Sequence, residues 1–163
     1  MKQHNVNITT NILPSDEALS TETAALLDGA KAAAHKAYAP YSKFRVGAAA
    51  LLDNGEVITG SNQENAAYPS GLCAERTTIF YANAKYPEAK VVRLLIYAET
   101  DKGPVLTPIS PCGACRQVLL EKETIQGQPM KVTLAGANDL YHLPGVAISL
   151  LPLSFVPKSL EGE

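Results

Sequence analysis

The spacing of apolar residues predicts helices in some segments of the chain and strands in others. Residues 21–39 are rich in alanine, follow Ser20 and end before Pro40, with apolar side chains three to four positions apart. A helix-capping residue type, helical spacing and a terminating proline together predict the first helix. Residues 44–62 instead contain two apolar runs around Asn54-Gly55, which predicts two strands joined by a tight turn.

The rest of the chain continues this alternation. Residues 73–86 and 115–123 have helical patterns, while residues 91–99 and 130–136 are apolar and β-branched, as buried strands are. The element order α-β-β-α-β-α-β predicts an α/β fold with one mixed sheet and helices on both faces. We expect residues 1–18 to form an arm, either loose or a first edge element, and residues 19–163 to form one domain.

The amino-acid composition of the chain argues against some classes of binding partner. The chain has 163 residues and a net charge of −2, with no block of one charge sign and no tryptophan. Basic residues are scattered, so we expect no nucleic-acid partner. No apolar run has the length of a signal peptide or a membrane span, so we expect a cytoplasmic protein with no membrane partner and a small-molecule ligand.

All three cysteines lie in two short motifs, "LCAER" and "PCGACRQ". Cys112 and Cys115 are three apart at the start of a predicted helix, which puts both sulfurs on one side of its first turn. Cys73 begins another predicted helix and could supply a third thiolate. Three sulfurs favour Zn²⁺ and leave one of its four positions for water or substrate, which is typical of a catalytic site. A structural zinc site with His4, His35 or His142 as fourth ligand is the alternative.

Two residues beside Cys73 strengthen the catalytic interpretation. Glu75 is two positions away, about 200° around a helix, so it is a poor direct ligand but could exchange protons with a water beside the metal. Arg76 falls on the same side as the Cys73 sulfur, where its charge would offset the thiolates. A solvated glutamate and a surface ion pair are the ordinary alternatives for these two residues.

The motifs resemble those of a known family. "YAPYSKFRVGAAALL", "NQENAAYPSGLCAERTTIFYA", "SPCGACRQVL" and "LLPLSF" are similar, in this order, to blocks of the zinc-dependent cytidine deaminases of the single-domain homotetrameric type. The resemblance implies a three-layer α/β/α sandwich with a five-stranded mixed sheet. It implies a hydrolase of pyrimidine salvage that converts cytidine or deoxycytidine to uridine or deoxyuridine and ammonia. One zinc per subunit would be held by Cys73, Cys112 and Cys115.

The resemblance also implies roles for individual residues. Glu75 would take a proton from the attacking water and pass it to the pyrimidine N3 and then to the departing amine. Phe44 matches a residue that lines the nucleoside pocket, Asn62 and Glu64 match a pair that binds the ribose 3′-hydroxyl, and the Ala74 N–H matches a contact to the base O2. Asn62 and Glu64 are two apart, so in an extended segment they point to the same side.

The resemblance further implies that four chains assemble and complete each other's pockets. Phe155 matches an aromatic residue that a neighbouring subunit places against the base, and Tyr68 lies in a segment near subunit boundaries. Residues 1–18 and 136–149 depart from the family pattern, as does Gln63, where an aliphatic residue is usual. These departures leave the zinc motifs intact.

Three other functions remain open. A deaminase of another cytosine-bearing small molecule, such as an aminoacyl-nucleoside antibiotic, would keep the same zinc motifs. A polynucleotide deaminase would need a basic or aromatic track, which the sequence lacks. A non-catalytic zinc module would need a fourth protein ligand.

Overall fold

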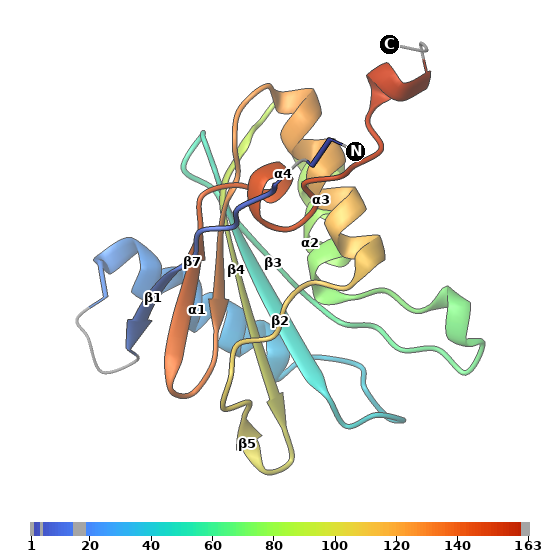
Figure 1. Ribbon diagram of the computed structural model, residues 1–163. Helices are drawn as coiled ribbons and strands as arrows, with labels where there is room; N and C mark the ends of the chain where they lie inside the picture. Colours follow the sequence, from blue (N-terminus) through green and yellow to red (C-terminus); the bar gives the residue numbers. More distant parts are fainter. Residues whose placement is uncertain (1, 4, 15–18, 161–163) are drawn as a thin grey trace.

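The computed structural model describes residues 2, 3, 5–14 and 19–160 of the chain. Its elements alternate along the sequence as the apolar pattern predicted, with additional short elements near both ends and in the middle of the chain (Figure 1). In chain order they are β1 (Asn11–Pro14), α1 (Thr21–Ala34), β2 (Arg45–Leu52), β3 (Val57–Ser61), η1 (Tyr68–Ser70), α2 (Ala74–Lys85), β4 (Val91–Thr100), β5 (Gly103–Pro104), α3 (Gly113–Gln126), β6 (Lys131–Ala135), β7 (Asp139–Leu143), α4 (Val146–Ser149) and η2 (Pro157–Leu160).

One mixed sheet forms the centre of the molecule. Its strand order is β1-β7-β6-β4-β2-β3, with β5 attached to β4. The β4–β6 pair is parallel and the other pairs are antiparallel, so the predicted mixed sheet is confirmed.

The sheet has seven strands, so the expected count of five is corrected. Two short strands account for the difference. Residues 11–14 of the N-terminal segment add β1 alongside β7. At Gly103 the backbone has φ 106°, which glycine adopts without steric cost, and this turn brings β5 back onto the end of β4.

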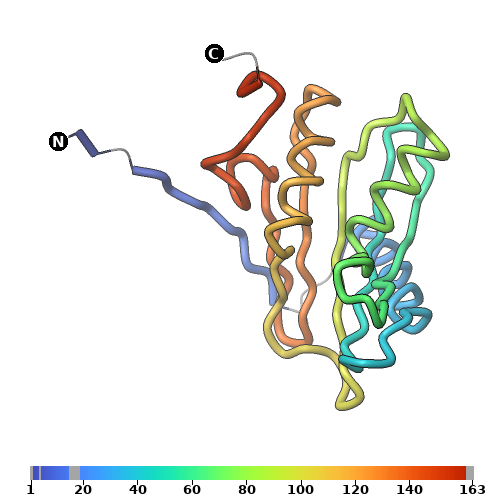
Figure 2. The backbone as a smooth tube through the Cα atoms, turned by 90° about the vertical axis from the view of Figure 1, so that its right-hand side faces the viewer, coloured from blue at the N-terminus to red at the C-terminus, as the bar shows by residue number. Residues whose placement is uncertain are grey.

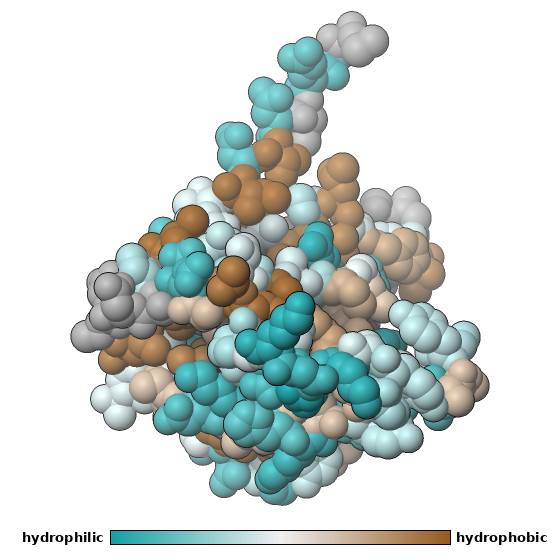
Figure 3. Space-filling view, turned by 90° about the horizontal axis from the view of Figure 1, so that it is seen from below, coloured by the Kyte–Doolittle hydropathy of each residue, from teal (hydrophilic) through white to brown (hydrophobic). Residues whose placement is uncertain are grey.

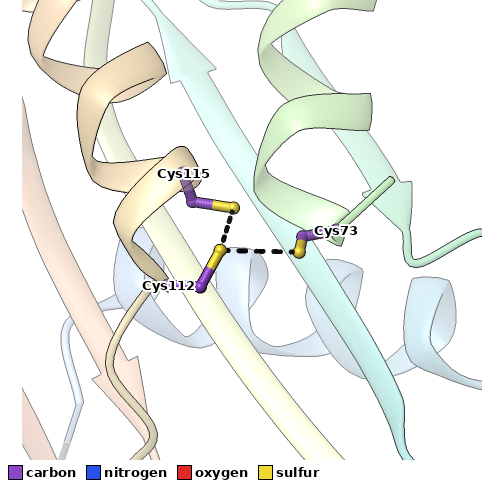
Figure 4. Close-up of side chains that lie close together, drawn as sticks. All are labelled: Cys73, Cys112 and Cys115. Atoms are coloured by element: carbon purple, nitrogen blue, oxygen red, sulfur yellow. Dashed lines mark hydrogen bonds between the residues drawn. The ribbon is translucent and has the colours of Figure 1, made fainter. Parts of the chain in front are cut away.

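Helices cover both faces of the sheet, as the alternating element order requires. In β4, Leu94, Ile96 and Ala98 pack in one apolar cluster, together with residues of α2 and α3. Leu95 and Tyr97 point to the opposite cluster, which contains residues of α1. This period of two is the pleat of a strand that is buried on both faces. Figure 4 shows α2 and α3 in front of the sheet and α1 crossing behind it.

Two glycines allow helices to approach the sheet closely. A Cβ atom at Gly47 would lie 1.9 Å from the Ala30 carbonyl oxygen of α1. A Cβ atom at Gly60 would lie 2.6 Å from Thr78 Oγ1 and 2.9 Å from the Thr78 nitrogen of α2. Since Cys73 immediately precedes α2, the contact at Gly60 helps to set the position of this cysteine against the sheet.

The described N-terminal residues before β1 form an extended segment that leaves the body of the molecule (Figure 2). The end of the molecule that carries the β4–β5 turn is largely hydrophilic, with Asp101 and Lys102 exposed (Figure 3). None of the described helices combines the length and apolar character needed to cross a bilayer. The division into an arm of residues 1–18 and one domain remains a prediction.

Candidate metal centre

Two helix N-termini bring the three cysteines together. Cys73 is the N-cap residue of α2 and Cys112 is the N-cap residue of α3, while Cys115 lies in the first turn of α3. Neither N-cap sulfur accepts a capping hydrogen bond. Cys73 Sγ lies 3.8 Å from Cys112 Sγ, which lies 3.5 Å from Cys115 Sγ (Figure 4). The sulfurs therefore point toward one another and not along their helices.

These distances suit a single tetrahedral zinc ion. Two sulfurs at about 2.3 Å from zinc, with tetrahedral angles between them, would be about 3.8 Å apart. The three sulfurs all lie within 4.8 Å of one another. Among the described residues the group that could hold a metal consists of these three cysteines alone. A set of three protein ligands leaves one position open.

The histidines considered as a fourth ligand do not join this group within the described part of the chain. His35 caps the C-terminal end of α1, behind the sheet, and its Nε2 lies 3.4 Å from Glu99 Oε2. His142 lies in β7, where its Nδ1 is 2.9 Å from Thr133 Oγ1. His4 lies outside the described residues.

The site favours a thiolate at Cys73. The neighbouring Cys115 thiol, together with Arg76 and Cys112, lowers the pKa of Cys73 to about 5. The same contact with Cys73 and the burial of Cys115 raise the pKa of Cys115. The positive ends of two helices meet here, which also favours anionic sulfur. A bound cation would displace the protons that remain on the other thiols.

Arg76 is placed to balance this negative charge. Its Nη2 lies 4.0 Å from Cys73 Sγ and 3.4 Å from the Gly71 carbonyl oxygen. Its Nε is buried and has no hydrogen-bond partner among the described residues. A buried N–H without a partner is costly, and additional negative charge on the nearby sulfurs would offset that cost. The cysteine cluster fits a bound divalent cation, and the positive charge of Arg76 would offset the net negative charge of three thiolates on that cation.

Glu75 is a buried carboxyl group beside the cysteines. It is the second residue of α2 and only 4% exposed. Burial raises its pKa, and the negative charge at Cys73 adds to the increase. A carboxyl group that is reluctant to ionise beside a metal site has the property of a general acid or base. The structure thus excludes the ordinary interpretation of Glu75 as a solvated surface residue.

A family model agrees with this geometry. Residues 20–127, which contain all three cysteines and Glu75, match the cytidine and deoxycytidylate deaminase zinc-binding region. The match covers well over half of the chain. The chain belongs to this deaminase family. Zinc is therefore the metal of the cofactor site.

Individual relatives support the family assignment. The chain is 49% identical to a cytidine deaminase of Halalkalibacterium halodurans over 87 residues, which are 52% of this chain and 60% of the relative. It is 45% identical to a cytidine deaminase of Sporosarcina psychrophila over 96 residues, 59% of this chain and 66% of the relative. The matched regions thus span less than two thirds of these two relatives.

A solved structure covers more of the chain. The crystal structure of a cytidine deaminase from Burkholderia pseudomallei superposes with a TM-score of 0.69 at 39% sequence identity. This similarity covers 84% of the present chain and 100% of the other. The predicted α/β/α fold of the deaminase family is confirmed.

The predicted sugar-binding residues lie alongside the chain that leads to the metal centre. Gln63 and Leu72 exchange both of their backbone hydrogen bonds, at 2.8 and 2.9 Å. This bridge places Asn62 and Glu64 beside the segment that enters Cys73. Both side chains already bind the backbone of residues 41–46, so they organise that segment as well as being available to a ligand.

The aromatic residues of the predicted nucleoside pocket lie farther apart. Phe44 is half-buried and packs against the apolar cluster of α2 and α3. Tyr68 in η1 is 91% exposed, and Phe155 in the C-terminal segment is 57% exposed. Within one chain these two side chains therefore do not close a pocket.

Sequence reasoning assigned no role to Arg116, which fixes the loop before Cys112. Its Nε donates to the Pro111 carbonyl oxygen at 2.8 Å and its Nη1 to the Leu150 carbonyl oxygen at 3.1 Å. Its Nη2 donates to Ser110 Oγ at 3.0 Å. No pattern in the sequence indicated this, because two of the three partners are main-chain carbonyl oxygens and Leu150 is 34 positions away.

Proposed function

We propose that this protein is a cytidine deaminase, which replaces the 4-amino group of cytidine or deoxycytidine with oxygen from water and releases ammonia. The observation that carries the proposal is the pairing of a three-cysteine metal site with a buried glutamate, Glu75, at the meeting point of two helix N-termini. A structural zinc site would need no buried carboxyl group. The named relatives, all cytidine deaminases, support the choice of reaction.

Cys73, Cys112 and Cys115 would hold the zinc, and its chemistry would be to acidify and position the attacking water. Glu75 would accept the proton that this water loses and deliver it to N3 of the base as oxygen bonds to C4. Glu75 would then carry the remaining proton of that water to the amine, and the C4–N bond would break to release ammonia. The raised pKa of Glu75 suits a group that must both gain and lose a proton during the reaction.

Arg76 would act through the sulfurs and not on the substrate. Three thiolates give zinc more electron density than histidines do, which weakens its effect on a bound water. A guanidinium group beside Cys73 draws some of that density back. We therefore assign Arg76 the role of tuning the metal.

Recognition of the substrate would depend on its sugar. Asn62 and Glu64 would bind the ribose 3′-hydroxyl, Phe44 would line the pocket, and the Ala74 N–H would contact the base O2. A hydrogen bond to a charged group contributes about 1.5–3 kcal/mol. Free cytosine, which lacks the sugar, should therefore be a poor substrate.

We further propose that the active form is a homotetramer in which neighbouring chains complete the pockets. Tyr68 and Phe155 would cover the nucleoside only if another chain brought them there, and both are exposed in a single chain. Three free cysteines fit a reducing compartment, so we place the protein in the cytoplasm, in pyrimidine salvage. A monomeric mass in solution with full activity would contradict the tetramer.

The test is a substrate panel followed by ultraviolet absorbance. The ultraviolet spectra of cytidine and deoxycytidine should change to those of uridine and deoxyuridine as the 4-amino group is removed, while cytosine should react at least about tenfold more slowly in kcat/KM. An aminoacyl-cytosine nucleoside and a short single-stranded DNA complete the panel. Turnover of either of these in preference to cytidine would overturn the proposed substrate, and equal kcat/KM for cytosine and cytidine would overturn the role of the sugar.

A further inference from the structure

The segment between Tyr41 and Val46 is held in place by a chain of hydrogen bonds that passes through Ser42. The Ser42 hydroxyl donates to Glu64 Oε1 and accepts from the Phe44 N–H at 3.0 Å. The backbone N–H groups of Tyr41 and Ser42 donate to Glu64 Oε2 at 2.9 and 3.3 Å. One hydroxyl group therefore connects the Glu64 carboxylate to the peptide of Phe44.

Asn62 holds the other side of the same peptide. Its Nδ2 donates to the Phe44 carbonyl oxygen at 2.9 Å, and its Oδ1 accepts from the Val46 N–H at 2.8 Å. Phe44 is thus fixed through its N–H by Ser42 and through its carbonyl group by Asn62. The residues proposed to contact the sugar and to line the pocket form one connected unit.

This unit retains capacity for a ligand. An ionised carboxylate offers about four acceptor positions, and Glu64 uses three of them within the chain. The Asn62 amide has a second N–H and a second lone pair beyond the two bonds it makes. A sugar hydroxyl could therefore donate to Glu64 and accept from Asn62 without breaking any of these bonds.

These bonds hold a segment that contains one backbone-strained residue and is packed on one side only. Lys43, between Ser42 and Phe44, has φ 56° and is the one non-glycine residue with positive φ in the described part of the chain. That left-handed conformation is sterically unfavourable for a residue with a side chain. A hollow of about 370 Å³, lined by Pro40, Lys43 and Arg45 among others, lies against the segment. Packing on that side is consequently incomplete.

We propose that Ser42 is a positioning residue that determines specificity for the sugar: its hydroxyl orients the Glu64 carboxylate toward the 3′-hydroxyl and couples that carboxylate to Phe44. The proposal rests on the proposed function, in which Glu64 binds this hydroxyl. Ser42 itself touches no reacting atom. Its contribution is that Glu64 is already aligned when the nucleoside arrives, so less conformational entropy is lost on binding.

The electrostatic state of Glu64 supports this arrangement. The pKa of Glu64 is lowered, and the hydrogen bond from the Ser42 hydroxyl is the largest cause. Desolvation opposes this decrease, while the hydrogen bonds from the backbone N–H groups of Tyr41 and Ser42 add to it. The carboxylate therefore stays ionised and accepts hydrogen bonds throughout the neutral range. Replacing Ser42 with alanine should raise the pKa of Glu64, whereas threonine should preserve the low value.

The kinetic test compares cytidine with 3′-deoxycytidine in wild type, Ser42→Ala and Ser42→Thr. Loss of a hydrogen bond that aligns a charged group should lower kcat/KM of Ser42→Ala for cytidine by about tenfold or more, and for 3′-deoxycytidine by less than about threefold. Ser42→Thr should stay within about threefold of wild type on both substrates. Lys43→Asn, in the same loop and with a residue type that tolerates positive φ, is the control that should retain the wild-type ratio of the two substrates.

Equal losses on both substrates would show that Ser42 supports only the general structure and would overturn the proposal, as would no loss on either. A second measurement separates this failure from that of the proposed function. Titration of the Glu64 carboxyl carbon by NMR should give a higher pKa in Ser42→Ala than in wild type or Ser42→Thr. An unchanged pKa would show that the Ser42 hydroxyl does not hydrogen-bond to Glu64, and it would overturn the proposal. A shifted pKa in a protein that does not convert cytidine would instead locate the failure in the proposed function, and the role in sugar specificity would fall with it.

Discussion

Cys73 Sγ and Cys112 Sγ lie 3.8 Å apart, although the two residues are 39 positions apart in the sequence and cap different helices. The metal centre is therefore a junction between α2 and α3, and it depends on how both helices pack on the sheet. Each helix contributes its positive N-terminal end, and α2 also contributes Glu75 and Arg76. A change that shifts one helix against the other should alter the metal site before it alters the fold.

Replacing the ligands should weaken zinc binding more than replacing the residue beside them. Loss of an outer partner of a metal ligand typically costs about 10–100-fold in affinity. Arg76→Gln should fall in this range, while Cys73→Ser and Cys112→Ser, which would each remove a proposed sulfur ligand, should lose more. Competition with a chromophoric chelator measures all three affinities, and far-ultraviolet circular dichroism checks the fold. Wild-type zinc affinity in Cys73→Ser would refute the assignment of that ligand.

The contact between Gly47 and α1 should be one of the most sensitive positions for stability. A Cβ atom there would lie 1.9 Å from the Ala30 carbonyl oxygen and 2.6 Å from the Ala34 nitrogen, both backbone atoms. Gly47→Ala should therefore lower the free energy of unfolding by about 3 kcal/mol or more, since overpacking a core costs about 1–3 kcal/mol even when flexible side chains can yield.

Gly29→Ala is the matched control for this substitution. Gly29 lies inside α1, and a Cβ atom there would be 3.4 Å from Thr59 Cγ2, an ordinary contact. Alanine is favoured over glycine in a helix by about 0.5–1 kcal/mol, so this variant should be neutral or more stable. Urea denaturation measures both variants. Equal stability of Gly47→Ala and wild type would show that α1 lies farther from β2 than the structure indicates.

His142 should make the protein less stable in mild acid. Burial lowers its pKa below the ordinary value of 6.5, and the nearby Arg93 adds to the decrease. Below about pH 6.5 the unfolded chain therefore binds a proton that the folded chain resists. The stability due to neutral His142 is complete above that pH and is lost as the pH falls toward the folded pKa. His142→Asn should flatten the dependence of the urea midpoint on pH between 7 and 5, by direct comparison with wild type. Parallel curves for the two proteins would contradict this account.

The sequence predicted the main elements because their signals are local. Alanine spacing before Pro40, the Asn54-Gly55 turn and the apolar run of residues 91–99 each specify an element within a few residues. The residue pattern did not predict β5 or β7, and it gave β1 only as one of two alternatives for residues 1–18. β1 exists only because β7 offers it an edge, and β5 consists of two residues at a glycine turn.

The clustering of the three cysteines was predictable for a different reason: all three lie in two short motifs beside predicted helix starts. The burial of Glu75 was not predictable, because it depends on how α2 meets the sheet and α3. Likewise, the bonds from Glu64 to Tyr41 and Ser42 span more than 20 positions of sequence, which no spacing rule reveals. The exposed positions of Tyr68 and Phe155 leave their predicted roles to be tested in the assembled protein.

The most direct test of the account is the activity of Glu75→Gln together with its zinc content. Glutamine keeps the size of the side chain but cannot transfer the proton, so the rate of cytidine deamination should fall by at least about 100-fold. The zinc content should remain that of wild type, because Glu75 lies outside the group of three sulfurs. Glu88→Gln, at an exposed position, is the control and should remain fully active. Full activity of Glu75→Gln, or loss of its zinc along with its activity, would contradict the central claim that this buried glutamate moves the proton at a three-cysteine zinc site.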